Sequence, residues 1–531
     1  MTREIESVAA LEEVHTEATR LLNAGDAGAA IALVDACHAV PGQETNVMQL
    51  QAAIHTDGGL QLARRDLVEH SVTLWKRLGP DDHQAIAYNL ANAELGLYQL
   101  GVAHGKLCTG WQDEREHLRT ARALYERIGE DASAPAELRL QAWTNAGNAY
   151  DIVGRNLDAL NCYDRALDLD PHFGMALGNR GVALHHFAPF MGKHAPTVVH
   201  QASLALDAAL VQGESVIRSG GDQALQRFEA LRKTMPSPTP AGPSPRRDGQ
   251  WANPHLDWCH RNQLFLHVSH ECLRENTETL DPLFFRSVVT GTDEDGQQRI
   301  RDLVDAFNAV KQEYVTARYV TWLSSDRRSP IREQAAAIAS RVRFLDSLEY
   351  ARWGVRTGMA IEALTAATNV LDKVASFVHL YLATARRARG ISFAALWQSA
   401  ARKPMDPELA AILAGPERNI GLLALCDLSC DVGAATPLSR RYGLRHTATH
   451  RFLVAHTDMV PNSNDWFDRV SWPDLVRETI AQLRIARAAL VYLAWLVDTH
   501  ESARRRAAPT TTSTIPSMPI PPVDTDLVEH E

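Results

Sequence analysis

Residues 142–171 read AWTNAGNAYDIVGRNLDALNCYDRALDLDP and decide the fold of the first half of the chain. Small and large residues recur here at helical spacing; they are Trp143, Gly147, Tyr150, Gly154, Ala159, Tyr163, Ala166 and Pro171. Small residues let two helices approach closely, and large ones fill the gaps between them. The stretch therefore predicts a pair of packed helices that ends at Pro171.

This pattern resembles a tetratricopeptide repeat (TPR) at nearly every diagnostic position. The segment from Ala176 restarts the pattern and places Gly181 at a small position. Weaker copies lie upstream, at residues 17–41, 63–80 and 87–101 and around Ala121 and Tyr125. A repeat stack needs roughly three or more units to bury a continuous core. Residues 1–234 are therefore predicted to form a TPR-like helical solenoid, with a generic helical bundle as the alternative.

A Pro-rich segment, residues 235–250, separates this region from the rest of the chain. It has no apolar period, so we expect an exposed linker. Residues 251–503 then carry long helical patterns with almost no β-type alternation. The last residues, 504–531, are rich in Thr and Pro and end in acidic residues, which predicts a disordered tail. The expected fold is all-α.

The composition fits a helical protein of two or more domains. A chain of 531 residues is too long for one ordinary core. Its apolar fraction of 45% and charged fraction of 22% are those of a soluble globular protein. The formal net charge of −10 argues against broad nucleic-acid coating, because binding along the phosphate backbone needs a basic surface. A small basic site within an acidic protein is still compatible with these numbers.

The cysteines and apolar runs favour an intracellular protein. Seven dispersed cysteines do not suggest a secreted disulfide framework, and Cys426 and Cys430 are expected to be free and buried. Residues 1–15 lack the apolar core of a signal peptide. The apolar run at residues 488–497 is too short to span a bilayer. We therefore expect a cytoplasmic protein with no membrane partner.

A basic segment without acidic residues marks the candidate site. Residues 445–450 read RHTATH, and residues 432–457 contain no Asp or Glu. The arginines in this window are Arg440, Arg441, Arg445 and Arg451. Arginine can hold phosphate oxygens with its planar fork, and histidine can move a proton near neutral pH. The segment therefore predicts a site for an anionic ligand.

The spacing of RHTATH sets its expected geometry. On a helix, Arg445 and His450 lie about 140° apart around the axis, so only the length of the arginine lets it reach toward the histidine. Gly443 is expected to precede the helix start, whose N-terminus would add backbone donors for a phosphate. His446 and His450 share a face. A solvated helix face is one alternative reading. A metal pair is the other, but no His-Glu-x-x-His motif is present, so no metal and no cofactor are predicted.

Residues 251–500 resemble the HEPN superfamily, an all-helical fold whose ribonuclease members carry Arg, four to six residues, and then His. They are more narrowly similar to the HEPN family found downstream of TPR repeats in bacterial proteins. The matching segments are WANPHLDWCHRNQLFLH (251–267), KQEYVTARYV (311–320), LDKVASFVHLYL (371–382), NIGLLALCDLS (419–429), LRHTATHRFLVAH (444–456) and LRIARAALVYL (483–493). The motif falls on Arg445 and His450, while His446 stands where Asn is usual and Thr449 where an acidic residue is usual.

The resemblance implies metal-independent RNA cleavage at a site shared by two HEPN domains, and hence a homodimer. In that scheme His450 moves a proton, Arg445 stabilises charge on the phosphorane, and His446 orients the phosphate or His450. The remaining arginines, Arg440, Arg441 and Arg451, are candidate RNA contacts. The TPR half is expected to bind a protein or peptide partner, and a toxin-like or phage-defence role follows from the family alone. The alternatives are a non-catalytic interaction or RNA-binding scaffold, and a partner or substrate of a nucleotidyl-transfer enzyme.

Three further groups have weaker interpretations. Cysteines and histidines gather early in the second half, but without a Cys-x2-Cys knuckle they are expected to be packing residues: Cys259, His260, His267, His270 and Cys272. Asp427 and Asp431 either support the basic segment or form an exposed acidic face. Another group either lines the cleft or pairs on a helix surface: Glu313, Tyr314 and Arg318.

Overall fold

The computed structural model describes residues 3–81, 83–102, 107–191, 195–236, 251–267, 273, 280–290, 293–345, 348–384, 391–397, 406–415, 418–432, 437–457, 460–507 and 513–516. The chain is all-α, as predicted: each long element is a helix, and the described strands are short. It divides into two compact units, Met1–Ala188 with Val199–Thr239, and Pro189–Val198 with Pro240–Glu531. Most of the predicted linker, residues 237–250, lies outside the described part of the chain.

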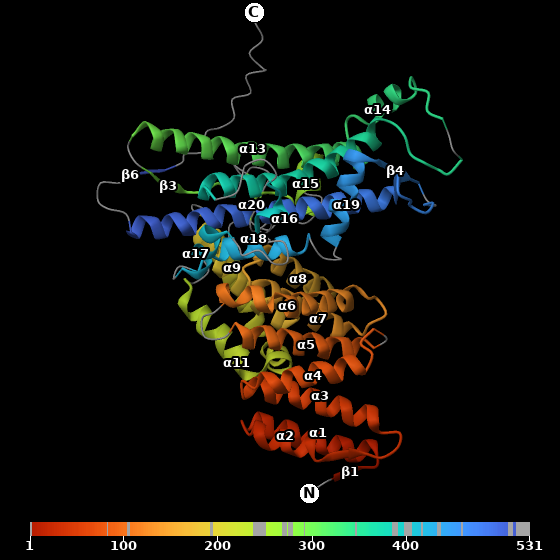
Figure 1. The fold of residues 1–531 in the computed structure, drawn as a ribbon, viewed down its shortest axis with the longest axis vertical. Coiled ribbons are helices and arrows are strands. Elements are labelled where there is room, and N and C mark those ends of the chain that lie inside the picture. The colour runs from red at the N-terminus through yellow and green to blue at the C-terminus, as the bar shows by residue number, and fades with distance from the viewer. Residues whose placement is uncertain are drawn as a thin grey trace, which may run out of the picture. The chain divides into compact units, whose positions relative to one another are not determined.

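The first unit is a row of helices in which α1 to α9 pack against their neighbours in the sequence and α11 packs on α9 (Figure 1). The helices are α1 (Val8–Asn23), α2 (Ala27–Asp35), α3 (Glu44–Gln61), α4 (Arg65–Arg77), α5 (Gln84–Gly101), α6 (Leu107–Glu130), α7 (Ala136–Asp151), α8 (Asn156–Leu169), α9 (Gly174–Phe187), α10 (Ala195–Val211) and α11 (Gly213–Thr234). A short turn, η1 (Ala188–Phe190), follows α9, and the strands β1 (Arg3–Ile5) and β2 (Cys37–Ala39) pair in parallel near the N-terminus.

Helices α7 and α8 hold the stretch quoted first, and they approach as closely as its small residues predict. A Cβ on Gly147 would lie 2.4 Å from Cε1 of Tyr163, so any larger residue there would clash. The Tyr163 hydroxyl donates to Asn148 Oδ1 at 2.9 Å. Gly154 turns the chain between the helices with a φ of +76°, which L side chains rarely adopt. This packing supports the resemblance to a repeat, and its assignment to the TPR family stays a prediction.

The second unit is a helical bundle with small strand pairs at its edges. Its helices are α12 (Pro254–Arg261), α13 (Glu294–Ser325), α14 (Arg332–Ala339), α15 (Val355–Leu382), α16 (Phe393–Trp397), α17 (Pro407–Ala414), α18 (Ile420–Cys430), α19 (Pro437–His450) and α20 (Trp472–Ala507). Its strands are β3 (Ser287–Thr290), β4 (Phe452–His456), β5 (Phe467–Ser471) and β6 (Ser513–Pro516).

Three long helices, α13, α15 and α20, pack on one another and form the centre of this unit (Figure 1). Aromatic rings fill the space between them: Phe307 lies edge-on to Phe285, with ring centroids 5.4 Å apart, and contacts Phe377 in the same way. Helix α13 starts at Asp293, whose side chain accepts the backbone N–H of Gly296 at 2.9 Å. Such a cap satisfies a donor that the first helical turn leaves unpaired.

A buried polar network ties the start of this unit to α13 and α20. The Arg318 guanidinium donates to both carboxylate oxygens of Asp281 at 2.9 and 2.8 Å, and to the carbonyl of Leu264. Burial opposes the charge of Arg318, but the Asp281 carboxylate outweighs it and raises the arginine's pKa. The Tyr314 hydroxyl donates to the same Leu264 carbonyl at 2.6 Å. Both side chains are therefore structural, and neither lines a cleft nor pairs on the surface; Glu313 instead pairs with Lys373.

Helix α20 contains the apolar run that the sequence suggested was too short for a membrane. By length and composition the whole helix could cross one. Most of it lies inside the bundle, however, since 78% of its apolar window is buried. The core helix of a soluble protein passes the same test, so this one candidate, found among the described residues only, is weak evidence for a span.

The prediction of a disordered tail from residue 504 is wrong for two segments. Helix α20 continues to Ala507, and Ser513–Pro516 form β6, which pairs antiparallel with β3. The partner strand lies more than two hundred residues earlier and supplies the backbone hydrogen bonds that the tail cannot make alone. Residues 508–512 and 517–531 lie outside the described part of the chain.

Candidate active site

The RHTATH motif lies wholly within α19, which begins at Pro437. The expected helix start at Gly443 is therefore wrong: Arg445 sits inside the helix, and His450 is its last residue. A helix N-terminus consequently offers this pair no donors. A buried stripe, Leu438, Arg441, Leu444 and Thr447, repeats every third residue and faces the rest of the bundle. This stripe leaves His446 and His450 exposed on the outer side.

Arg445 is held by an acidic residue of a neighbouring helix. Its Nη1 donates to Oδ2 of Asp372, on α15, at 2.6 Å. The other carboxylate oxygen of Asp372 accepts the backbone N–H of Phe393 at 2.9 Å. Asp372 is thus anchored at the start of α16 and fixes the arginine in turn. Among the described residues, this pair engages one of the five N–H donors of the Arg445 guanidinium, which is 29% exposed.

The two histidines of the motif lie side by side. The ring centroids of His446 and His450 are 4.8 Å apart, as their spacing of one helical turn predicts. Both rings are exposed to solvent. Thr449, at the position where the family often has an acid, donates its hydroxyl to the Arg445 carbonyl at 2.9 Å. It therefore bonds its own helix instead of contacting His450 through a carboxylate.

The end of α19 is fixed against the β4–β5 pair. The Thr447 hydroxyl donates to Oδ2 of Asp468, on β5. The backbone N–H of Arg451 donates to the Thr447 carbonyl at 2.8 Å and ends the helix there. β4 begins at the next residue and runs parallel to β5. The position of His450 is therefore set by the Thr447–Asp468 hydrogen bond before it and by strand β4 after it.

The other arginines of the window differ in exposure. Arg441 donates Nε to Glu478 Oε2, on α20, at 2.8 Å, and burial lowers its pKa. The Arg440 guanidinium lies 3.6 Å from the same carboxylate but is 56% exposed. Arg451 is exposed directly after His450. Because the Arg441 side chain is out of reach of solvent, we retain only Arg440 and Arg451 as candidate RNA contacts.

The structure gives Asp372 a role that the sequence did not predict, and it corrects one alternative for Asp427. Asp372 lies in the segment LDKVASFVHLYL, but its pairing with Arg445 across 73 residues has no local signal. Asp427 was considered for an exposed acidic face, and that alternative is wrong because its side chain is fully buried on α18. Cys426 and Cys430 on the same helix are free and buried, which confirms their prediction.

The Cys and His residues expected to be packing residues do not assemble a metal cage in the described part of the chain. No three His, Cys, Asp or Glu side chains come together there as metal ligands. Cys259 is free and buried, with its sulfur 3.3 Å from Nε2 of His255. Burial raises the pKa of this thiol to about 12, so the thiol is protonated at neutral pH. His270 and Cys272 lie outside the described residues.

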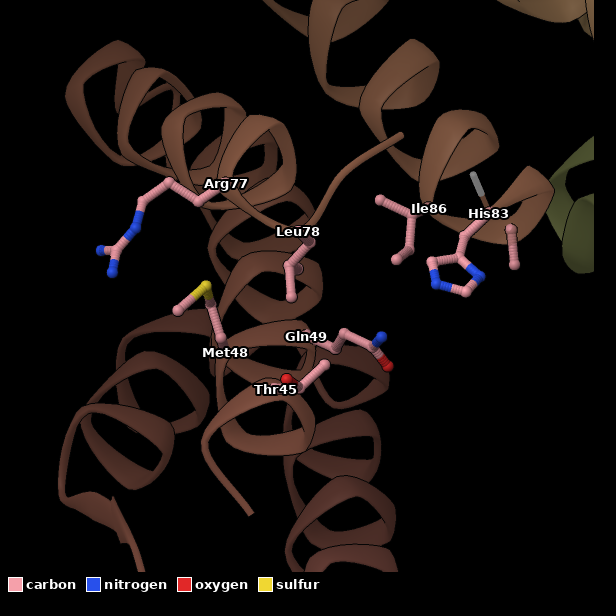
Figure 2. Close-up of a pocket in the computed structure, with 8 residues that line it drawn as sticks. Thr45, Met48, Gln49, Arg77, Leu78, His83 and Ile86 are labelled. Carbon is pink, nitrogen blue, oxygen red and sulfur yellow. The ribbon is translucent and has the colours of Figure 1, made fainter. Parts of the chain in front are cut away.

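A cavity of about 450 Å³ lies in the first unit (Figure 2). Met48 and Gln49 of α3 line one side of it, and Leu78 and Ile86 line the other. Arg77 adds a cation at its edge. The polar side chains of Thr45 and His83 also line it.

The comparison with protein families found one match, which lies in the second unit. Residues 295–500 match the family model described as LA2681-like HEPN. The match starts in α13, ends in α20 and includes the whole RHTATH motif. No curated protein matches the chain. The match supports a HEPN domain in the C-terminal half, and with it a nuclease or RNA-related function in general.

Proposed function

We propose that this protein is a metal-independent endoribonuclease that cleaves RNA through Arg445 and His450. The observation that carries the proposal is one helix end: an exposed imidazole, a second imidazole 4.8 Å away, and a partly exposed, anchored guanidinium. These groups can move a proton and bind a phosphate without a metal. They lie within the region that matches the HEPN model.

The reaction uses the 2′-hydroxyl of the RNA as nucleophile. The 2′-oxygen forms a bond to the adjacent phosphorus, and the bond from phosphorus to the 5′-oxygen of the next nucleotide breaks. One histidine takes the proton of the 2′-hydroxyl, or gives a proton to the leaving 5′-oxygen. The products are a 2′,3′-cyclic phosphate and a free 5′-hydroxyl. We assign this proton transfer to His450, with His446 orienting the phosphate or His450.

Arg445 stabilises the charge that builds up on the phosphorane. The N–H groups of Arg445 that do not bond Asp372 can donate to the equatorial oxygens of the phosphorane. Because Asp372 already holds the guanidinium in place, the arginine has to move less when the transition state forms. The imidazole and the guanidinium lie on different sides of α19, about 140° apart. A complete site therefore needs a second copy of the motif, which a homodimer through the HEPN domain supplies.

The helical first unit is proposed to bind a protein or peptide partner and so to target or regulate the nuclease. Its 450 Å³ cavity is lined by apolar and polar side chains together with Arg77 and His83, which suits part of a peptide near an acidic group (Figure 2). A cytoplasmic toxin or antiviral defence effector is the role that this combination suggests.

The test compares wild type with His450→Ala on total RNA in the presence of EDTA. Wild type should cleave and leave 2′,3′-cyclic phosphate ends, while the variant should not. His172→Ala, which removes an exposed histidine of the first unit, is the matched control and should cleave like wild type. Equal cleavage by wild type and His450→Ala would overturn the assignment.

A second candidate function is a non-catalytic scaffold that binds RNA or a protein. It is favoured by the Arg445–Asp372 ion pair, which occupies the arginine when no ligand is present. The same experiment separates the two functions, because a scaffold would bind RNA and leave it intact. A partner of a nucleotidyl-transfer enzyme would instead show covalent modification of this chain.

A further inference from the structure

Exposed aromatic rings follow directly on the candidate active site. Phe452 is 56% exposed at the start of β4, and Trp466, just before β5, is 69% exposed. The rings of Phe452 and Phe467 stack with centroids 5.1 Å apart and planes inclined by 25°. The Arg469 guanidinium lies 5.1 Å from the Phe467 ring centre. We call Phe452, Trp466 and Phe467 the aromatic ledge.

The strand pair holds the rings of Phe452 and Phe467 on the side away from the core. In the β4–β5 register, Phe452 lies opposite Phe467, and Ala455 lies opposite Val470. Side chains alternate between the two faces of a strand. Ala455 and Val470 belong to the apolar core beneath. Phe452 and Phe467 are therefore on the outer face. Trp466 precedes β5, its carbonyl accepts the backbone N–H of Phe452 at 3.2 Å, and its side chain is exposed.

The ledge lies close to the reacting groups. Phe452 follows His450 by two residues, so their Cα atoms are at most about 7 Å apart. The hydrogen bond from Thr447 to Asp468 joins the helix of the motif to β5, one residue from Phe467. Helix α19 and β4 also pack on each other (Figure 1). The distance between the imidazole and the rings is thus fixed by the fold.

The charges around the ledge favour an anionic ligand. Arg451 is exposed between His450 and the ledge, and Arg469 lies over one of its rings. Two acids are near: Asp468 accepts the bond from Thr447, and Asp465 is exposed beside Trp466. The two cations and two acids balance, and the exposed Arg451 next to His450 would attract a phosphate backbone to that edge of the rings.

We propose that the aromatic ledge is a stacking subsite for an unpaired base beside the scissile phosphate, so that the substrate is single-stranded RNA. The inference rests on the proposed function and adds its substrate class. Proteins that bind single strands combine a cationic track with aromatic rings on which bases stack. A base within a duplex already stacks on both faces and offers no free face to Trp466. Paired RNA is accordingly a poor substrate.

Binding tests the ledge separately from cleavage. In the full chain carrying His450→Ala, a labelled single-stranded RNA of about ten nucleotides is titrated at fixed salt, beside the same sequence as a duplex. Adding Trp466→Ala should weaken single-strand binding about 5- to 150-fold, the range for losing one stacked base, with little effect on the weaker duplex binding. Trp353→Ala removes another half-exposed tryptophan, of the segment before α15, and should change neither.

Cleavage by the otherwise wild-type chain adds a second readout. Trp466→Ala should raise KM more than it lowers kcat, and the loss should disappear on a substrate with an abasic nucleotide at the position next to the cleaved bond. Cleavage lost in His450→Ala but unchanged in Trp466→Ala, on every substrate, would overturn the ledge and leave the proposed function standing.

Two other outcomes also decide the matter. If wild type does not cleave RNA but His450→Ala still binds single strands through Trp466, the ledge holds and the nuclease fails. If Trp466→Ala changes the mass of the particle measured by light scattering and leaves RNA binding intact, the ledge is a protein interface, and the RNA subsite is overturned.

Discussion

The α7–α8 pair and the α19 site are held together by different kinds of contact. In the pair, Gly147 meets Tyr163, and Tyr163 bonds Asn148, across separations of about one helix. In α19, the side chains of the motif helix are held by residues far away in the sequence. Arg445 pairs with Asp372 across 73 residues, and Arg441 pairs with Glu478 across 37.

The difference teaches where sequence patterns are informative. A pattern of small and large residues predicts both members of a helix pair, because the two helices are adjacent in the sequence, at residues 136–169. An arginine in the sequence indicates only that an acidic partner is expected. Many Asp and Glu residues elsewhere in the chain could be that partner, so the sequence does not identify it. The following changes test this contrast, from the largest expected effect to the smallest.

His450→Ala should lower RNA cleavage by about 10²- to 10⁴-fold, the usual range for losing one acid–base group. Because its ring is exposed, the free energy of unfolding should change by less than about 0.5 kcal/mol. Cleavage of a labelled RNA and urea denaturation of the same preparations measure both. A large loss of stability together with the loss of activity would mean that His450 acts as a packing residue, as Gly147 and Tyr163 do in α7–α8. The contrast between the two regions would then not hold.

Gly147→Ala should destabilise the first unit by about 1–3 kcal/mol, because the added Cβ would overlap the Tyr163 ring. Gly28→Ala in α2 is the matched control, since nothing lies within 4 Å of its Cβ position, and it should be neutral or slightly stabilising. Denaturant titration measures both. Equal stabilities would mean that the helices of the pair can move apart, and the local contact would not be decisive.

The stability of the protein should depend on pH through His255, because residues distant in the sequence bury its side chain. Burial, helped by the Arg318 charge, lowers the pKa of His255 from 6.5 to about 4. Between these values the unfolded chain binds more protons than the folded one, so stability falls as the pH drops from about 6.5 to about 4. Because His255 is only partly buried, solvent screening reduces this effect. We expect the free energy of unfolding to fall by about 1–2 kcal/mol. His255→Phe should flatten this slope in denaturation series at pH 7 and pH 5; an unchanged slope would contradict the assignment.

Asp372→Asn should have the smallest effect, about a tenfold loss of cleavage. It keeps an oxygen for the Phe393 N–H but removes the charge that fixes Arg445. The loss should appear in kcat, because the arginine then reorganises in each turnover. Faster cleavage by this variant would show that Asp372 competes with the RNA and does not position the arginine.

The helices themselves were predictable because their patterns are local. The helix pair at residues 142–171 and the free, buried Cys426 and Cys430 follow from spacing and apolarity. The start of α19 was not predicted, because Gly443 suggested a break that the buried stripe through Leu438 and Leu444 overrides. The β4–β5 pair was missed for a related reason: parallel strands of five residues are stabilised by each other and by the core beneath, and neither pattern is distinctive alone.

The candidate site was half visible in the sequence. The acid-free window and the spacing of Arg445, His446 and His450 could be read directly. The aromatic ledge could not, since Phe452 and Trp466 are fourteen residues apart and resemble ordinary core residues. The buried network of Tyr314 and Arg318 likewise had no signal, because burial depends on what packs against a helix.

The sequence by itself determined the all-α class and the identity of the groups that can do chemistry. It did so because helical periodicity and side-chain chemistry are properties of neighbouring residues. Only the tertiary structure decided that Arg445 is anchored by Asp372, that Arg441 is buried, and that aromatic rings stand beside His450. Those facts depend on contacts between distant segments, whose energies are set by burial and exact pairing after the chain has folded.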